Sequence, residues 1–180
     1  LWGIRIEGGN KVSVDERMVH DIVQKVMANM QISGSVSGMH GVFKDMNDAI
    51  NASIEAQKKV CTMTLDQREQ IISLIRKKTH ENAEILANMG VNETGMGNVG
   101  DKILKHHLTA DKVPGTEDIS TIAWSGDRGL TLVEMGPFGV IGAITPATNP
   151  SETVICNCIG MLAGGNTVVF NPHPAAIKTS

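Results

Sequence analysis

Apolar residues in the first two thirds of the chain recur at the spacing of amphipathic helices. Asp45 is a candidate N-cap for a helix that runs to about Val60. Residues 64–67 (TLDQ) form a capping box, in which the Thr hydroxyl and the Gln side chain each satisfy a free backbone amide. The box opens a helix with apolar positions at 71–75, and another helix is predicted around the apolar positions at 85–89. This part of the chain is therefore predicted to be helical.

An earlier apolar stripe lies within residues 15–31, which predict an amphipathic helix. Residues 1–14 have no periodicity and predict an unstructured leader, and residues 32–40 are rich in Ser and Gly and predict a flexible linker. A tethered helix cannot bury its stripe against the tether, so it must dock on its own domain or on another protein. The pattern alone favours its own domain and leaves both possibilities open.

Strand patterns follow in the last third of the chain. Residues 121–124 and 130–135 flank a turn at 125–129 (SGDRG), which predicts a hairpin. Residues 138–144 predict a buried strand and residues 166–170 a second strand, with a helix between them. This βαβ-type unit indicates an α/β fold. Because two parallel strands do not make a finished sheet, we expect the chain to be the amino-terminal fragment of a longer protein.

Composition narrows the class of protein. The chain has 180 residues, a net charge of −3 and a pI near 6.1, and its tightest basic cluster, at 76–78, resembles a solvated helix face. No electrostatic case for a nucleic-acid partner arises. Three cysteines fit a reducing compartment, and no apolar run approaches the ~18 residues that span a membrane. No secretory signal is recognisable, so a cytoplasmic protein without a membrane partner is expected.

Two motifs match functional patterns only superficially. Residues 95–100 (GMGNVG) fit GxGxxG, but a helix precedes them instead of a strand, so helix termination is the better interpretation. Cys156 and Cys158 are two residues apart on a predicted helix and point about 200° away from each other. Cys158 continues an apolar stripe, and neither cysteine has a nearby His in sequence. We predict that neither is a nucleophile or a ligand.

The histidines do not form a recognisable metal site. His106 and His107 are adjacent, and their spacing from Asp101 and Asp111 matches no known ligand pattern. Exposed side chains are expected for both, and no metal site is predicted.

Asn149 is the sharpest candidate for chemistry, because it follows the first predicted strand of the βαβ unit. Ligands bind at the carboxyl ends of strands in open α/β sheets. Asn149 precedes Pro150, so it can simply be the N-cap of the next helix. Its amide can also donate to a developing oxyanion, and both roles are compatible if the carbonyl caps while the NH2 group donates. Thr145, Thr148 and Ser151 add hydroxyl groups around the same turn.

Several motifs together resemble a known family. They are residues 145–150 (TPATNP), 163–170 (AGGNTVVF), 171–174 (NPHP), 93–97 (ETGMG) with Asp101-Lys102, and 114–118 (PGTED). From about Gly41 to Ser180 the chain resembles the coenzyme-A-acylating aldehyde dehydrogenases, and more narrowly the propionaldehyde and acetaldehyde dehydrogenases of bacterial microcompartments. Residues 15–30 with their linker resemble the encapsulation helix of those enzymes.

The resemblance implies the amino-terminal part of an aldehyde-dehydrogenase fold over residues 41–180. Its parts would be amino-terminal helices, the β-hairpin of the oligomerisation part and the first βαβ unit of an incomplete Rossmann-like nucleotide-binding domain. The implied reaction is oxidation of a short-chain aldehyde (acetaldehyde or propionaldehyde) by NAD, with acyl transfer from a cysteine thioester to coenzyme A. The nucleophilic cysteine would lie beyond Ser180, so the fragment alone is expected to be inactive. A homo-oligomer is implied, located in the cytoplasm or in a microcompartment whose shell protein would bind residues 15–30.

By the same resemblance, Asn149 would donate to the oxyanion. Two segments would contact the cofactor, namely Thr145, Pro146, Ala147 and Thr148 on the nicotinamide side, and Asn171, Pro172, His173 and Pro174 near the adenosine. Many hydrolytic relatives have Lys-Pro where this chain has Asn171-Pro172, which leaves NAD versus NADP open. His173, between two prolines, can contact a ligand or merely pack. The alternatives are a hydrolytic aldehyde dehydrogenase, a non-catalytic cargo segment and, more distantly, a Rossmann alcohol dehydrogenase.

Overall fold

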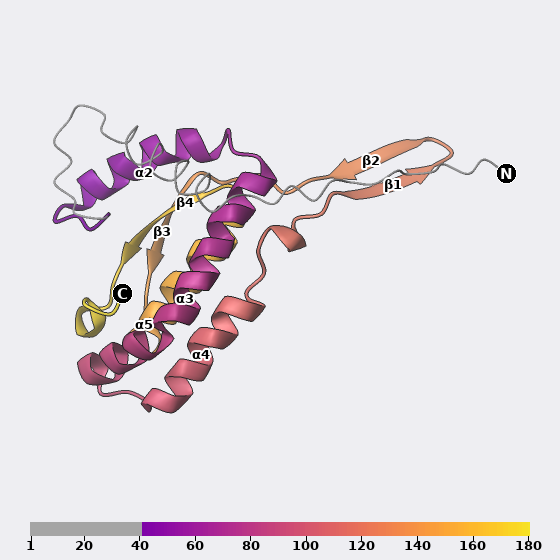
Figure 1. Cartoon of the computed structure of the whole chain (residues 1–180). Helices are drawn as coiled ribbons and strands as arrows, with labels where there is room; N and C mark the ends of the chain where they lie inside the picture. Colours follow the sequence, from indigo (N-terminus) through magenta and orange to yellow (C-terminus); the bar gives the residue numbers. More distant parts are fainter. Residues whose placement is uncertain (1–40) are drawn as a thin grey trace, which may run out of the picture. The chain divides into compact units, whose positions relative to one another are not determined.

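The computed structural model describes residues 41–180, and the leader, the amphipathic helix and the linker predicted for residues 1–40 lie outside the described residues. Within the described residues three α-helices come first, then a hairpin, then a strand–helix–strand unit (Figure 1). The elements are α2 (Met46–Val60), α3 (Leu65–Thr94), α4 (Val99–Lys112), η1 (Thr116–Asp118), β1 (Ile122–Gly126), β2 (Gly129–Val133), β3 (Val140–Ile144), α5 (Pro150–Ala163), β4 (Thr167–Asn171) and η2 (Pro174–Ala176). None of these helices is long and apolar enough to cross a membrane.

Side chains cap the starts of the first helices as predicted. Asp45 Oδ1 accepts the backbone N–H of Asn47 at 2.8 Å. In the capping box, Thr64 Oγ1 accepts the Gln67 N–H at 3.2 Å, and Gln67 Oε1 accepts the Thr64 N–H at 2.9 Å. Both predicted helix starts are confirmed, because short polar side chains satisfy the free amides of a first turn wherever the chain turns into a helix.

The prediction of two helices between residues 65 and 94 is wrong, since α3 is one helix of 30 residues. The stretch that looked like a break is polar in sequence, yet it contributes Thr79 and Ala83 to the buried side. The Thr79 hydroxyl donates to the Ile75 carbonyl at 2.8 Å, so a polar residue fits the stripe. The helix ends at Gly95, which adopts a left-handed φ of 67°. The interpretation of residues 95–100 as helix termination is therefore confirmed.

Two arginines of α3 join it to the carboxyl ends of the neighbouring helices. Arg68 Nη1 donates to the Ala163 carbonyl at 2.5 Å, at the end of α5. Arg76 donates to the carbonyls of Ala110 at 2.6 Å and Val113 at 2.9 Å, at the end of α4. These carbonyls are the unpaired, partly negative end of a helix, which a guanidinium satisfies well. The predicted solvated face at 76–78 is therefore wrong for Arg76, whose side chain is only 20% exposed.

The core lies where α3 and α5 pack together. Ile72, Ile159 and Ala163 are fully or almost fully buried, and partly buried apolar side chains surround them. Helix α4 packs against both α3 and α5, so the three helices lie side by side (Figure 1). This packing fixes the first turn of α5, which follows β3 after the turn at residues 145–149.

Strands β3 and β4 pair in parallel, with Val140 opposite Thr167 and Ile144 opposite Asn171. The predicted βαβ-type unit is confirmed, but its first strand is not buried. Ile144 is 83% exposed, whereas the alternate residue Ala143 is buried. Side chains alternate across a strand, and one face of β3 stays open within residues 41–180. A uniformly apolar strand does not reveal from its own sequence which face is covered.

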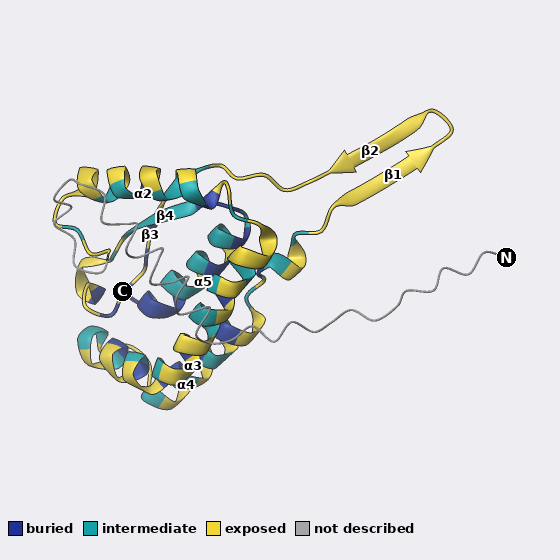
Figure 2. Cartoon of the chain, turned by 45° about the horizontal axis from the view of Figure 1, so that its top comes forward, coloured by how far each residue is buried: buried dark blue, intermediate teal, exposed yellow. Residues whose placement is uncertain are grey.

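The predicted hairpin is confirmed with a tighter turn. Strands β1 and β2 are antiparallel and closed by the pair Gly126 and Gly129, so only two residues form the turn. Every residue of both strands is exposed (Figure 2). The apolar residues on them include Trp124 and Leu130.

Candidate active site at the carboxyl ends of two parallel strands

Parallel pairing brings the two predicted cofactor segments to the same edge. The Thr145 N–H donates to the Asn171 carbonyl at 3.2 Å, one step beyond the last strand pair. Residues 145–148 and 171–174 therefore leave the sheet side by side. This is the edge at which ligands bind in open α/β sheets.

The residues of these two segments differ in exposure. In the first, Thr145 and Ala147 are buried, while Pro146 and Thr148 are exposed. In the second, Pro172 is partly buried, whereas Asn171, His173 and Pro174 are exposed. His173 caps η2, because its Nδ1 accepts the Ala175 N–H at 3.1 Å. The structure thus gives His173 a local structural role at the start of η2, and its contact with a ligand stays a prediction.

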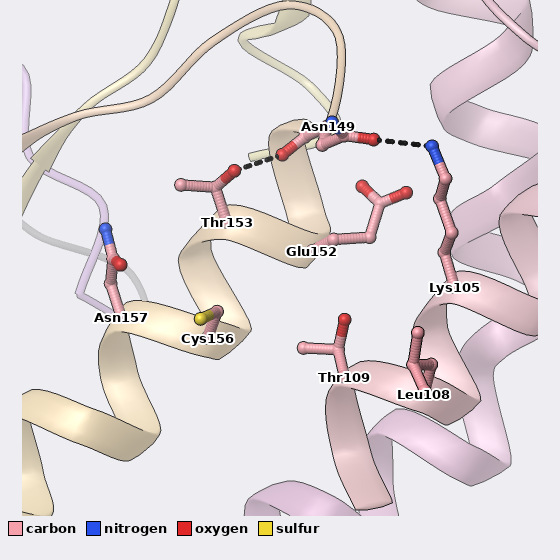
Figure 3. A pocket seen from close by; sticks show the side chains of 8 residues that line it. All are labelled: Lys105, Leu108, Thr109, Asn149, Glu152, Thr153, Cys156 and Asn157. Carbon is pink, nitrogen blue, oxygen red and sulfur yellow. Dashed lines mark hydrogen bonds between the residues drawn. The ribbon is translucent and has the colours of Figure 1, made fainter. Parts of the chain in front are cut away.

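Asn149 occupies the N-cap position of α5, but its side chain makes no capping hydrogen bond. The capping role that the sequence left open for its amide carbonyl is therefore not present, although Asn149 does stand at the N-cap position. Oδ1 instead accepts from Lys105 Nζ at 3.2 Å (Figure 3). It also lies 3.5 Å from Lys102 Nζ. Charged donors form stronger hydrogen bonds than backbone amides, which explains why Oδ1 binds lysine instead of the N–H groups of the first turn of α5. Pro150 stands at the first helical position as expected.

Lys102 is a buried lysine that binds three groups around this turn. Its Nζ donates to the Thr148 carbonyl at 2.5 Å, to Glu152 Oε1 at 3.1 Å and, at the longer distance above, to Asn149 Oδ1. Its side chain is 4% exposed and that of Glu152 is 7% exposed. An ammonium group has three protons, and these acceptors match that number.

His106 completes the buried network, so the prediction that it is exposed is wrong. It is fully buried, with Nδ1 2.7 Å from the Lys102 carbonyl and Nε2 2.8 Å from Ser151 Oγ. A carbonyl oxygen only accepts, so Nδ1 carries a proton. Ser151 Oγ also lies 3.3 Å from Glu152 Oε2, which closes the network on the Lys102 partner.

One signal in the sequence could have revealed this network. Lys102, His106 and Ala110 are four residues apart and are the buried residues of α4. Residues at this spacing share one helix face. Two of the three are polar, so an analysis based on apolar stripes passes over them.

His107 lies apart from the network, against His80 on α3. Their rings stack with centroids 4.9 Å apart, and His80 Nε2 lies 2.8 Å from Asp111 Oδ1. Within residues 41–180 no group of three or more His, Cys, Asp or Glu side chains is arranged to hold a metal ion.

A pocket of about 290 Å³ opens between α4 and α5 beside this turn (Figure 3). Its lining residues are Lys105, Leu108, Thr109, Asn149, Glu152, Thr153, Cys156 and Asn157. Asn149 is fixed at one end, where its backbone carbonyl accepts the Thr153 hydroxyl at 2.6 Å. The pocket therefore combines one apolar side chain of α4 with several polar groups and the amide of Asn149.

Residues 12–180 match the aldehyde dehydrogenase family model. The chain belongs to the aldehyde dehydrogenase family. An acetaldehyde dehydrogenase (acetylating) from Bilophila wadsworthia (strain 3_1_6) is 46% identical over 174 residues, which cover 92% of this chain and 36% of the relative. The predicted family is thus confirmed, and this relative is of the predicted acylating group.

Two solved structures match most of the described residues. The propionaldehyde dehydrogenase of the Clostridium phytofermentans fucose utilisation bacterial microcompartment is 79% identical with a TM-score of 0.75, over 78% of this chain and 32% of that one. Rhodopseudomonas palustris propionaldehyde dehydrogenase, solved with bound CoA and an acylated cysteine, is 50% identical with a TM-score of 0.75, over 78% and 32% of the two chains. The predicted fold class is confirmed. The chain spans about a third of the length of these relatives.

The cysteines of this aldehyde dehydrogenase chain do not form a nucleophilic site at Asn149. Burial raises the pKa of the Cys158 thiol to about 11, so the thiol stays protonated near neutral pH. Cys156 is exposed in the pocket but lies seven residues beyond Asn149, which is about 10 Å along the helix axis. Both observations agree with the prediction that neither is the nucleophile.

Within the part of the chain that the structure describes, one buried hydroxyl group at the carboxyl ends of β3 and β4 is free to bind a polar ligand. Thr145 Oγ1 is buried and has no hydrogen-bond partner among residues 41–180. Buried hydroxyl groups are normally paired, so a polar group bound at this edge would satisfy it. The residues present are therefore compatible with the nicotinamide nucleotide of this enzyme family.

Proposed function

We propose that this chain supplies the oxyanion side and part of the cofactor side of a coenzyme-A-acylating aldehyde dehydrogenase. The full-length protein that contains residues 1–180 would oxidise acetaldehyde or propionaldehyde to the acyl-CoA. The observation that carries the proposal is the position of Asn149, at the carboxyl end of β3, with its amide oxygen bound by two lysines. The acylating relatives support the same assignment.

Asn149 would act on the oxygen of the aldehyde. A cysteine thiolate from beyond Ser180 attacks the carbonyl carbon, a C–S bond forms, and the carbonyl oxygen becomes an oxyanion. Asn149 Oδ1 is already occupied by lysine donors, and Nδ2 has no acceptor among the described residues. The NH2 group is therefore the part of this side chain that can donate to the oxyanion.

The nicotinamide would be held at the strand edge by Thr145, Pro146, Ala147 and Thr148, and the adenosine by Asn171, Pro172, His173 and Pro174. When bound, the nicotinamide accepts the hydride that leaves the aldehyde carbon. The resulting thioester then passes its acyl group to the thiol of coenzyme A. Asn171 is uncharged and adds no preference for or against a ribose phosphate, so both NAD and NADP are candidates.

The pocket beside Asn149 supports a small aldehyde. It borders the amide and offers Leu108 to a short alkyl chain, with hydroxyl groups of Thr109 and Thr153 nearby. The pocket is shallow and wide open within residues 41–180, so its volume of about 290 Å³ sets no limit on the length of the aldehyde.

The proposal also includes a homo-oligomeric state and a location in the cell. The exposed apolar residues of the hairpin support a homo-oligomer, because two of them, Trp124 and Leu130, have no cover within residues 41–180. We infer a microcompartment location, with a shell protein bound by residues 15–30, from the source of the Clostridium phytofermentans relative. Residues 15–30 fused to a reporter should localise to the shell, and a reporter that stays diffuse in shell-forming cells would contradict targeting.

One assay tests the reaction and the role of Asn149 together. The full-length protein is given propionaldehyde and NAD⁺ with or without coenzyme A, and NADH and propionyl-CoA are both measured. We expect turnover to require coenzyme A and Asn149→Ala to lower kcat by about 100- to 1,000-fold. Asn88→Ala, at an exposed asparagine of α3, should leave kcat unchanged. Equal NADH production without coenzyme A would instead indicate the hydrolytic reaction.

A further inference from the structure

The buried pair of Lys102 and Glu152 has no need to be ionic for stability alone. Removing two charges from water is expensive, and apolar residues of similar volume often stabilise a protein equally well. The pair nevertheless joins the first turn of α5 to α4, directly beneath the turn that carries Asn149. We therefore expect the Lys102 ammonium group to have a role that an apolar side chain could not have.

We propose that Lys102 is the positioning residue for Asn149, an inference that rests on the proposed function. Its ammonium group donates to the carbonyl of Thr148 and lies within 3.5 Å of the side-chain oxygen of Asn149. It thereby holds both the backbone before Asn149 and the amide itself. Only an acceptor can face an ammonium group, so the amide orientation is fixed with Nδ2 on the other branch.

The network behind Lys102 gives this contact its rigidity. Glu152 binds Lys102 Nζ, and the Ser151 hydroxyl lies between Glu152 and the fully buried His106. His106 in turn binds the carbonyl of Lys102. Every member belongs to α4 or to the first turn of α5, so the ammonium group has little freedom to leave Asn149.

Lys105 assists from the exposed side of the same helix. Its Nζ donates to Asn149 Oδ1 at 3.2 Å, and this group forms no second hydrogen bond or ion pair among residues 41–180. Two positive charges at the amide oxygen polarise the amide and strengthen its N–H groups as donors. Because Lys105 is exposed, we assign it the smaller effect.

A purely structural role for the pair is the competing explanation, and a set of variants of the full-length protein separates the two. Lys102→Met removes the positioning group and leaves Glu152 without its partner. Lys102→Met with Glu152→Met removes the whole pair, so it should regain thermal stability. Asn149→Ala combined with Lys102→Met shows whether Lys102 acts through Asn149. Lys112→Met, at an exposed lysine in the last turn of α4, is the matched control.

We expect Lys102→Met to lower kcat by about 10- to 100-fold with little change in the KM for propionaldehyde, because the oxyanion forms only during the reaction. The double Met variant should regain its melting temperature but not kcat. In the Asn149→Ala background Lys102→Met should have a much smaller effect on kcat, limited to its hold on the Thr148 carbonyl. If Lys102→Met does not fold, the double Met variant carries the test, since it contains no unpaired buried charge.

Two results would overturn the inference. The first is recovery of both stability and kcat in the double Met variant. The second is an equal loss of kcat from Lys102→Met with and without Asn149. Either result would leave the proposed function intact if Asn149→Ala itself shows the expected loss of kcat, by about 100- to 1,000-fold, and wild-type turnover requires coenzyme A. If Asn149→Ala keeps wild-type kcat, the proposed role of Asn149 fails first, and the positioning role fails with it.

Discussion

Lys102 Nζ lies 3.1 Å from Glu152 Oε1 in a buried ion pair that joins α4 to the first turn of α5. The pair has His106 and Ser151 behind it and Asn149 beside it. The contact between α4 and α5, the first turn of α5 and the candidate oxyanion donor therefore lie next to one another.

Glu152→Leu should destabilise the full-length protein strongly, because it leaves the Lys102 ammonium buried without a counter-charge. We expect a loss of about 3–5 kcal/mol in the free energy of unfolding, measured by chemical denaturation. Glu55→Leu is the matched control, since Glu55 pairs with Lys58 on the surface. Exposed pairs contribute at most about 1 kcal/mol, so a similar loss in both variants would contradict the burial argument.

His106→Ala should also be destabilising, through a cavity and through loss of the bonds to Ser151 and the Lys102 carbonyl. We expect a loss of about 2–4 kcal/mol in the free energy of unfolding. His107→Ala, at a partly exposed ring stacked on His80, should lose less than about 1 kcal/mol. An equal loss of stability in His106→Ala and His107→Ala would show that His106 is no more buried than His107.

Glu93 should make stability depend on pH. The Thr179 hydroxyl, the Lys178 N–H and the Thr179 N–H hold its pKa below the ordinary value of 4.5. Because the folded pKa is lowered, the stabilisation is present above pH 4.5 and is lost as the pH falls through the folded value.

The melting temperatures of wild type and Glu93→Gln should therefore differ most at pH 6–7 and converge as the pH falls from 4.5 through the lowered pKa of Glu93. Glu84→Gln, at an exposed glutamate of the same helix, is the control. A difference that stays constant from pH 7 to pH 3 would rule out a role for the Glu93 charge.

The two cysteines of α5 should differ in reactivity. Cys156 is exposed, whereas burial raises the pKa of Cys158 to about 11. At pH 8 only about 0.1% of the Cys158 thiol would be ionised, so alkylation by iodoacetamide should be at least about 10-fold slower than at Cys156. Peptide mass spectrometry over a time course measures both rates in one sample. Faster labelling of Cys158 would contradict the partly buried position of its thiol.

Local features of the fold could be read from the sequence where the physical cause is itself local. Asp45 and the capping box at Thr64 satisfy amides within their own first turn, so their prediction needs no other part of the chain. The hairpin and the strand–helix–strand unit follow from turn residues and apolar runs in the same way. Gly95 also ends α3 by its own left-handed backbone, as the glycine-rich stretch suggested.

Features that depend on a distant partner could not be read in this way. Arg76 resembles a surface cation until the end of α4 is placed against it. The polar stretch around Thr79 resembles a helix break until its small side chains are seen to pack. Ile144 resembles a core residue, although its face of the sheet is open within residues 41–180.

At the candidate site, too, some features depend on neighbours in the chain and others on distant residues. The sequence by itself determined that Asn149 follows a strand, precedes Pro150 and begins a helix, because those relations are set by neighbours in the chain. Only the tertiary structure decided that its amide oxygen faces Lys105 and Lys102 instead of capping its own helix. The reason is that a charged donor 44 or 47 residues away binds the amide more strongly than a backbone N–H of the first turn, and its approach depends on how α4 packs against α5.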